Sequence, residues 1–288
     1  MRVAPDVIVR ELGSVAELAD VVALQRRIWG FGDLDVVPVH LLLTAAHHGG
    51  LVLAGFLDEQ PVGMAFGFAG QTADGRPKHC SHMTGVVADA RGRGVGAALK
   101  WRQRSLVLER GVGLVTWTFD PLEAGNATFN LRHLGARSDT YLIDVYGDLD
   151  DDLNRGLPSD RLLVRWHLDD PAVVARAAER DHGERTTPVA AHPSDVTQRL
   201  LRTAVRSGVR VPVEVSPPEA ASALVEIPID VQRLKRDAPE AAHAWRLAVR
   251  AALTAAFAGG YEAVDVLRGE QNGVPVAGYR LERPPLAT

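Results

Sequence analysis

The residues with the clearest chemical character form the run RGRGVG, which begins at Arg91 and is followed by Ala97. The start of a helix leaves backbone N–H groups unpaired and carries the positive end of the helix dipole. Glycines let an anion approach these groups without interference from Cβ atoms, and the guanidinium groups of Arg91 and Arg93 can pair with a phosphate. The run therefore predicts a phosphate or pyrophosphate on the amides of residues 92–97. A strand-to-helix turn that merely needs small residues is the simpler alternative.

The segments on either side of this run support a strand, a loop and a helix in that order. The preceding residues are apolar and β-branched at Val86 and Val87, and the chain turns at Asp89-Ala90. The following apolar residues recur at the helical period of 3.6, at Val95, Ala98, Leu99 and Leu106.

Three phosphate-binding motifs can be compared with the run. A Walker loop is excluded because no Lys-Ser or Lys-Thr follows the glycines. A dinucleotide fingerprint can be forced through Gly92, Gly94 and Ala97, but that fold normally begins with this unit, and roughly a third of the chain precedes it here. The third pattern, Arg/Gln-x-x-Gly-x-Gly/Ala, is met by Arg91, Gly94 and Gly96. It resembles the acyl-CoA pyrophosphate loop of the GNAT superfamily of acyltransferases.

Composition places the chain among ordinary globular proteins of one large or two small domains, with 288 residues, 46% hydrophobic and 24% charged. A formal net charge of -4 without a dense basic run argues against a nucleic-acid partner. The single Cys80 excludes an internal disulfide and a cysteine-cluster metal site. No signal peptide or membrane-length apolar run is apparent, so we expect a cytoplasmic enzyme without a membrane partner.

The pattern of the first 168 residues predicts a mixed α/β domain. Ser14 and Glu17 form a capping-box pattern, and Gly135 is a candidate C-cap glycine. Glycines at 63, 67 and 70 suggest that another group approaches the backbone of their strand. The expected strands are 6–12, 51–57, 61–69, 79–88, 114–119, 140–146 and 161–168, and the expected helices are 14–29, 38–46, 95–110 and 123–134.

This order is similar to the GNAT fold, an α/β (α+β) fold with a mixed sheet, over about residues 6–168. The resemblance implies that the strands before and after the loop helix splay apart, and that the exposed backbone contacts the pantetheine arm of acetyl-CoA or another acyl-CoA. The implied cofactor-binding residues are Thr84, Gly85, Val86, Arg91, Gly92, Arg93, Gly94, Val95, Gly96, Ala97 and Asn126. The segment 117–136, with FDPL and NATFN, resembles a branch of predicted acetyltransferases.

The remaining chain is expected to form a helix and linker over 169–195 and a smaller α/β domain over 196–288. The helix covers 169–181, and the polar segment 182–195 forms the linker. A strand at 224–229, a helix at 237–258 with Asp237 as N-cap, and strands at 264–268 and 276–282 resemble half of a GNAT unit. Because a second Arg-Gly-x-Gly loop is absent, a second CoA site is not expected. This domain either forms a wall of the substrate site or only extends the core.

Acyl transfer from a thioester to an amine needs an oxyanion donor, a base and an acid. A backbone N–H near Val86 could stabilise the oxyanion. The superfamily often uses a tyrosine as the general acid, four residues before the glycine that ends the helix, but that position is Leu131 here. Tyr141 is a substitute, whereas His133 faces another side of the helix.

His82 is the candidate base, because it shares a strand face with Thr84 and histidine titrates near neutral pH. A histidine bonded to a neighbouring strand is the structural alternative. Asp120 could bind a cationic substrate or the base, or could simply be a turn aspartate before proline. No metal site is predicted, since His47 and His48 have no third ligand.

The sequence thus favours an acyl-CoA-dependent N-acyltransferase, most simply an N-acetyltransferase, acting on a small amine by direct attack in a ternary complex. The alternative is a catalytically degenerate CoA-binding sensor or scaffold, and a nicotinamide-binding protein is a weaker third hypothesis. The sequence leaves a homodimer open.

Overall fold

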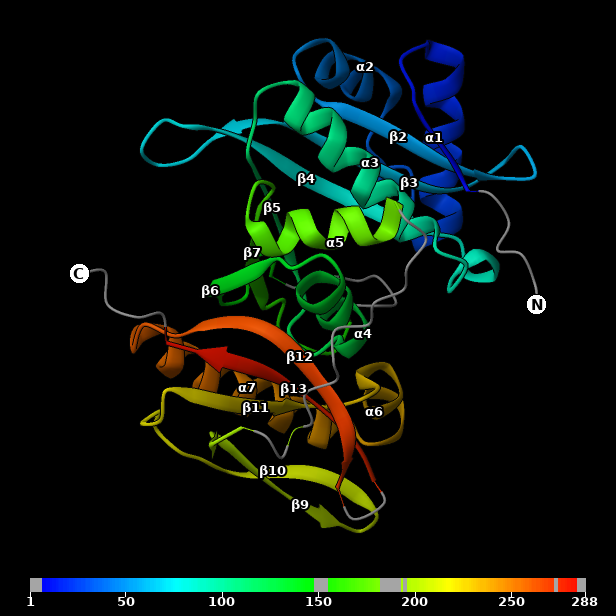
Figure 1. The fold of residues 1–288 in the computed structure, drawn as a ribbon. Coiled ribbons are helices and arrows are strands. Elements are labelled where there is room, and N and C mark those ends of the chain that lie inside the picture. Colours follow the sequence, from blue (N-terminus) through cyan, green and yellow to red (C-terminus); the bar gives the residue numbers. More distant parts are fainter. Residues whose placement is uncertain (1–6, 148–154, 182–192, 194–195, 272–273, 284–288) are drawn as a thin grey trace. The chain divides into compact units, whose positions relative to one another are not determined.

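The computed structural model describes residues 7–147, 155–181, 193, 196–271 and 274–283 (Figure 1). The chain divides into two compact units. Unit 1 contains residues 1–117 and 167–169, and unit 2 contains residues 118–166 and 170–288. The predicted division at residues 168 and 196 stays a prediction, and the predicted linker lies outside the described residues except for Pro193.

Within the described ranges, no helix has the length and apolar character required to span a membrane.

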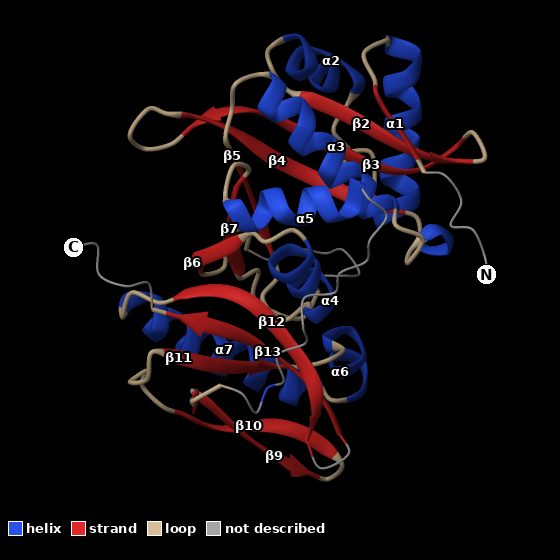
Figure 2. Ribbon diagram, viewed as in Figure 1, coloured by secondary structure: helices blue, strands red, loops and turns tan. Residues whose placement is uncertain are grey.

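Unit 1 is an antiparallel sheet with helices, to which a parallel strand is added. Strands β1 to β4 pair antiparallel in chain order, and β5 pairs with β4 in parallel. The mixed sheet and the mixed α/β class predicted from the sequence are therefore confirmed (Figure 2). The elements are β1 (Ile8–Glu11), α1 (Val15–Trp29), α2 (Val39–His47), β2 (Leu51–Leu57), β3 (Gln60–Gln71), β4 (Pro77–Val86), the 3-10 turn η1 (Ala88–Ala90), α3 (Val95–Glu109) and β5 (Leu114–Phe119), whose last two residues belong to unit 2.

The glycines of β3 are explained by close packing. A Cβ atom on Gly63 would lie 2.8 Å from Cγ1 of Val95, so α3 rests directly on the strand backbone. A Cβ atom on Gly67 would lie 2.3 Å from Nε2 of His79. Real Cβ contacts are not this short, so these positions require glycine. The predicted approach of other groups to this strand is confirmed.

Unit 2 contains a sheet in which the strands follow the order β7, β6, β12, β13, β11 and β8, together with a separate hairpin of β9 and β10. The long helix α7 packs on β6, β10 and β11. The elements are α4 (Ala124–Ala127), the π-helical turn η2 (Thr128–His133), β6 (Arg137–Leu142), β7 (Arg161–His167), whose last residue belongs to unit 1, α5 (Pro171–Asp181), β8 (Gln198–Arg199), β9 (Leu201–Arg206), β10 (Val209–Val215), β11 (Ser222–Ile227), α6 (Val231–Asp237), α7 (Pro239–Ala258), β12 (Glu262–Gln271) and β13 (Val274–Glu282).

Local end signals were predicted correctly at two helices. Ser14 and Glu17 form the reciprocal capping box at the start of α1, and Gly135 adopts a left-handed φ of 76° after η2. The predicted N-cap at Asp237 is wrong, because Asp237 is the last residue of α6. Pro239 disfavours the helical conformation of the preceding residue, so Ala238 is non-helical (φ -152°, ψ 69°) and separates α6 from α7.

Two further differences concern strands and helix type. The predicted helix 123–134 is a single α-turn followed by the π-helical turn η2. The predicted strand 140–146 is instead β6, which ends at Leu142 and is followed by exposed Ile143. The hairpin of β9 and β10 was not predicted, although Ser207 and Gly208, both with positive φ, form a turn between two alternating segments.

Candidate functional site

The loop between β4 and α3 has the backbone conformation that its glycines allow. Gly92 and Gly94 have φ values of 75° and 86°, in the left-handed region. A Cβ atom built on either glycine would meet no neighbouring atom within 4 Å. The backbone angle, and not crowding, requires glycine here, and the space beside the loop is open.

The first backbone N–H groups of α3 point beyond its N-terminal end and have no partner within the helix. The helix follows Gly94 as N-cap, and within the described part of the chain no side chain caps it. Its first i to i−4 hydrogen bond is donated by the amide of Ala98 to the carbonyl of Gly94 (3.0 Å). The amides of residues 95–97 precede this bond, so they are available to an anion at the positive end of the helix dipole.

Two exposed arginines add positive charge to this loop. The Nε atom of Arg91 donates to the carbonyl of Val86 (3.1 Å), which fixes the loop to the end of β4. Arg93 lies between the two left-handed glycines. The loop therefore combines outward amides, positive charge and open space, and these features fit a phosphate or pyrophosphate group.

Strand β4 pairs with β5 only near its beginning. His79 pairs with Val115 and Cys80 with Thr116, whereas residues 81–86 have described partners only on β3. The buried Oγ1 atom of Thr84 has no hydrogen-bond partner among the described residues. The short ladder agrees with the expected divergence of these strands, and it leaves one edge of β4 able to bond an extended ligand.

His82 lies on β4 beside two aromatic rings. Its ring centroid is 5.9 Å from that of Phe66, which it meets edge-on, and 5.9 Å from that of Phe68. Desolvation lowers the pKa of His82, so the imidazole is neutral at neutral pH and can accept a proton. The alternative of a histidine bonded to a neighbouring strand has no described hydrogen bond to support it.

Sequence reasoning missed a buried polar cluster on the other face of β4. Lys100, 2% exposed, donates from Nζ to Oε1 of Gln103 (2.6 Å) and Oγ of Ser81 (3.0 Å). The same Nζ lies 3.9 Å from the ring centroid of Trp117, and Nε2 of Gln103 is 3.1 Å from Nε2 of His79. A partial signal was present, because Gln103 lies in the helix stripe of Leu99 and Leu106, and Lys100 is three residues, or about one turn, before Gln103.

Burial changes the protonation of this cluster. It lowers the pKa of Lys100 from 10.5 to about 7. Burial, together with the charges of Lys100 and Arg110, lowers the pKa of His79 to about 4. Near neutral pH, the side chains of His82 and Lys100, both beside β4 in unit 1, can therefore take up or release a proton. Of these two, only His82 was predicted as a base.

Asp120, which lies in unit 2, is part of a buried ion pair. Its two carboxylate oxygens accept hydrogen bonds from Nη1 (2.9 Å) and Nη2 (2.6 Å) of Arg246. One of them also accepts the amide of Leu122 (2.8 Å), as expected of a turn aspartate before proline. Arg246 is 1% exposed, so this pair anchors α7 to the end of β5 inside unit 2.

Tyr141 is also held inside unit 2. Its hydroxyl donates to Oδ2 of Asp160 (2.7 Å), and Arg250 donates to both oxygens of that carboxylate (2.8 Å each). Burial and the Asp160 carboxylate raise the pKa of Tyr141, so its proton is held more tightly. Leu131 is fully buried, and Asn126 is exposed on α4. The structure thus places the predicted loop residues and His82 in unit 1, and Asp120, Tyr141 and Asn126 in unit 2.

No family model and no curated protein sequence matches this chain. Solved structures similar to it include a GNAT-family acetyltransferase from Streptococcus pneumoniae, at 16% identity over 56% of this chain and 98% of that one, with a TM-score of 0.46. The ribosomal-protein-S18-alanine N-acetyltransferase of Escherichia coli matches at 15% identity over 57% of this chain and 94% of that one, with a TM-score of 0.44. The ribosomal-protein-alanine N-acetyltransferase of Brucella melitensis matches at 20% identity over 55% of this chain and 98% of that one, also with a TM-score of 0.44.

Proposed function

We propose that this chain is an acyl-CoA-dependent N-acyltransferase of the GNAT type that transfers an acetyl or other acyl group to a small amine. The observation that carries the proposal is the loop between β4 and α3, with its left-handed Gly92 and Gly94, its outward helix amides and its exposed Arg91 and Arg93. A diphosphate is the group that this combination of donors and charge suits best.

The same segment would bind the rest of the cofactor. The amides of residues 92–97 would hold the diphosphate of coenzyme A, and the edge of β4 at residues 84–86 would bond the pantetheine arm. In the reaction, the amine nitrogen attacks the thioester carbonyl carbon, and the C–S bond breaks to release the thiolate. Holding both reactants side by side would supply much of the rate acceleration. A backbone N–H near Val86 would stabilise the oxyanion.

His82 is the proposed base for the proton that the attacking amine loses. Its lowered pKa keeps the ring neutral at neutral pH, and its position on β4 is two residues before Thr84. A neutral imidazole can take a proton directly or through one water. The departing thiolate would then be protonated by solvent, because Leu131 occupies the position where the superfamily often has a tyrosine and the hydroxyl of Tyr141 is bonded to Asp160.

A second candidate function is a CoA-binding sensor or scaffold without turnover. Specific contacts favour it: Leu131 is buried where the superfamily often has a tyrosine, Tyr141 donates to Asp160, and Asp120 pairs with Arg246. Neither Tyr141 nor Asp120 is therefore placed to exchange protons with a substrate. In this second function the loop would still bind coenzyme A, but no group would complete the reaction.

Calorimetric titration with coenzyme A and several acyl-CoAs, followed by thiol-release assays with a panel of amines, separates these functions. An enzyme should bind acyl-CoA and release thiol, and His82→Ala should lower kcat at least tenfold while His133→Ala, a substitution of an exposed histidine in unit 2, leaves it unchanged. Binding without release across the panel would favour the sensor. If no CoA species binds, both functions are wrong.

A further inference from the structure

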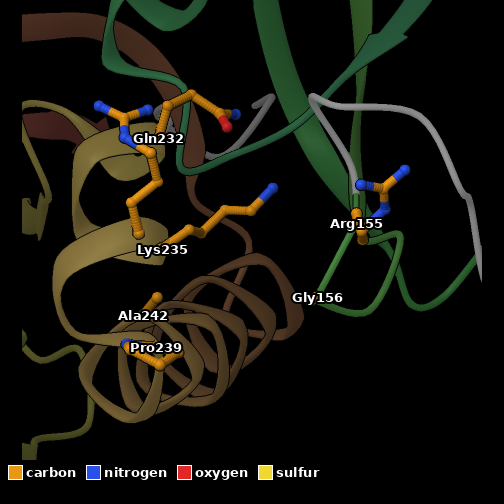
Figure 3. A pocket seen from close by; sticks show the side chains of 7 residues that line it. Arg155, Gly156, Gln232, Lys235, Pro239 and Ala242 are labelled. Carbon is orange, nitrogen blue, oxygen red and sulfur yellow. The ribbon is translucent and has the colours of Figure 1, made fainter.

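A cavity of about 530 Å³ in unit 2 is lined by polar groups that already have partners within the chain (Figure 3). The Nε2 atom of Gln232 donates to Oε1 of Glu123 (2.5 Å), and Arg155 and Lys235 also have interaction partners. These polar groups are used by the fold of unit 2, so the cavity is not assigned a ligand.

The rings of Phe66, Phe68 and His82 form an aromatic cluster in unit 1. The centroids of the two phenyl rings are 6.2 Å apart, and each lies 5.9 Å from that of His82. These separations and the tilted or edge-on orientations are typical of favourable aromatic pairs. Phe66 is 3% exposed, whereas Phe68 is 40% exposed. Among the described Phe, Trp and Tyr residues of unit 1, Phe68 alone is exposed, so its ring can contact a ligand.

A β-bulge in β4 directs His82 toward these rings. Phe66 pairs with Met83, and the next residue of β3, Gly67, pairs with Ser81. His82 is therefore the extra residue, without a partner of its own in this ladder. Bulges redirect side chains and are common beside functional sites.

The bulge places His82 on the face of the sheet that α1 covers. A Cβ atom on Gly85 would lie 2.5 Å from Cζ2 of Trp29, so Gly85 faces α1. Phe66 faces the same way, because its partner in β4 is two residues before Gly85. The ring of His82 meets that of Phe66 on this face, so the prediction that His82 shares a face with Thr84 is wrong.

The two strands that carry the aromatic cluster contain no carboxylate. Neither β3 nor β4 has an Asp or Glu, and Lys78 is charged. In the turn between the strands, Asp74 pairs with Nε of Arg76 (2.7 Å). An amine with several positive charges would therefore gain little from these strands, and an amine with an apolar substituent is favoured.

We propose that the amine accepted by this chain carries an aromatic ring, and that Phe68 sets this preference by packing against that ring. The inference rests on the proposed function, because it requires the amine nitrogen beside His82 and the thioester at residues 84–86. With the nitrogen there, a short alkyl linker would bring the aromatic substituent to Phe68, whose ring is next to that of His82. Phe68 is thus a specificity-determining residue that touches the substrate.

Calorimetric titration of the full chain with 2-phenylethylamine, with and without coenzyme A, tests this preference. This amine should bind at least about tenfold more tightly than butane-1,4-diamine, and at least about threefold more tightly than 2-cyclohexylethylamine, which has a similar size but no π-system. Phe68→Ala should weaken its binding at least about tenfold, whereas Phe68→Tyr, which keeps the ring, should stay within about twofold. Ile8→Ala removes another exposed apolar side chain of unit 1 and should leave binding unchanged.

Equal affinities for the three amines, or equal losses in Phe68→Ala and Ile8→Ala, would overturn the proposal. Circular dichroism shows whether each variant is folded. If Phe68→Ala does not fold, Phe68→Leu keeps an apolar side chain without the ring and should bind 2-phenylethylamine at least about threefold more weakly.

Titration with coenzyme A alone and thiol release with the three amines test the proposed function separately. Thiol release without a preference for 2-phenylethylamine would overturn the role of Phe68 and leave the acyltransferase function in place. If no CoA species binds, both proposals are wrong.

Discussion

The two units bury charge in different ways. In unit 1, Lys100 donates to the neutral side chains of Ser81 and Gln103 and lies over the ring of Trp117. In unit 2, Arg246 and Arg250 each form two hydrogen bonds to one carboxylate, Asp120 and Asp160 respectively. The charge in unit 1 can be lost near neutral pH, whereas the guanidinium groups of unit 2 stay charged.

This difference separates the residues that hold the fold together from the residues that could take part in a reaction. Asp120 and Tyr141 have the residue types of a catalytic site, but their hydrogen bonds belong to a permanent network around α7. His82 and the loop before α3 have exposed groups and few internal partners. Burial and hydrogen-bond pairing therefore distinguish structural residues from candidate site residues better than residue type does. Variants in unit 2 and in unit 1 test that conclusion.

The largest effect is expected when the chain is cut after residue 168. The fragment would lack Arg246 and Arg250, so the fully buried carboxylate of Asp160 would lose its two guanidinium hydrogen bonds. We expect the fragment 1–168 to be insoluble or to lack cooperative unfolding, measured by soluble expression and circular dichroism. Removal of residues 284–288 alone is the control. A folded fragment would instead support the predicted domain boundary at residue 168.

Substituting Arg246 with methionine should destabilise the full chain by about 3–5 kcal/mol, because it leaves the Asp120 carboxylate buried without its partner. Urea unfolding measures the change in the free energy of unfolding. The matched control is Arg202→Met, which breaks the exposed pair with Glu214 and should cost only about 0–1 kcal/mol. Equal losses in the two variants would mean that the buried network is not structural.

In unit 1, Gly94→Glu should weaken coenzyme A binding by about 100-fold, or ~2.7 kcal/mol, because a carboxylate would lie where the diphosphate is proposed to bind. Gly94→Ala is the control, since both variants carry the strain of a positive φ, which is about 1–2 kcal/mol, but only one adds charge. Calorimetric titration measures both affinities. An unchanged affinity in Gly94→Glu would show that the diphosphate does not bind at this loop.

The free energy of unfolding should rise between pH 7 and pH 9 through Lys100. Its pKa is about 7 in the folded chain and near 10.5 when unfolded, so the unfolded chain holds more protons in this range. The rise is at most about 1.4 kcal/mol per pH unit for one group. Lys100→Met should remove this contribution to the pH dependence of the free energy of unfolding and leave the contributions of other groups. Parallel pH profiles for the two proteins would contradict the lowered pKa.

The smallest effect is expected at the capping box of α1. Ser14→Ala removes the acceptor for the Glu17 amide and should cost about 1 kcal/mol. Thr44→Ala, at an exposed position inside α2, should change stability by less than about 0.5 kcal/mol. Urea unfolding compares the two, and coenzyme A affinity should stay the same in both. A loss of affinity in Ser14→Ala would connect this cap to the loop before α3.

Features governed by local physics were predictable from the sequence. The capping box at Ser14 and the glycine at 135 depend on a few neighbouring residues, and both predictions are confirmed. The strand–loop–helix around residue 92 depends on the same local rules. The break at Ala238 could also have been found, because Pro239 is a local signal that the apolar period of α7 concealed.

The charged networks could not be predicted, because they join residues that are far apart in the chain. Arg246 lies 126 residues from Asp120, and Arg250 lies 90 residues from Asp160. Nothing in the neighbourhood of Asp120 distinguishes a catalytic carboxylate from one paired with a distant helix. The burial of Lys100 is an intermediate case, since it lies one turn before Gln103, which is in the apolar stripe of the helix, but its contacts with Ser81 and Trp117 join residues that are distant in the chain.

Residues 167–169 belong to unit 1, although the chain on both sides of them belongs to unit 2. The amide of Leu168 donates to the carbonyl of Gly113 (2.9 Å), and its own carbonyl accepts two hydrogen bonds from Arg104 (3.1 and 2.6 Å). During translation, these hydrogen bonds of unit 1 therefore cannot form when residue 117 leaves the ribosome. They wait for three residues that are synthesised about fifty positions later, so unit 1 is completed only after the start of unit 2 has been synthesised.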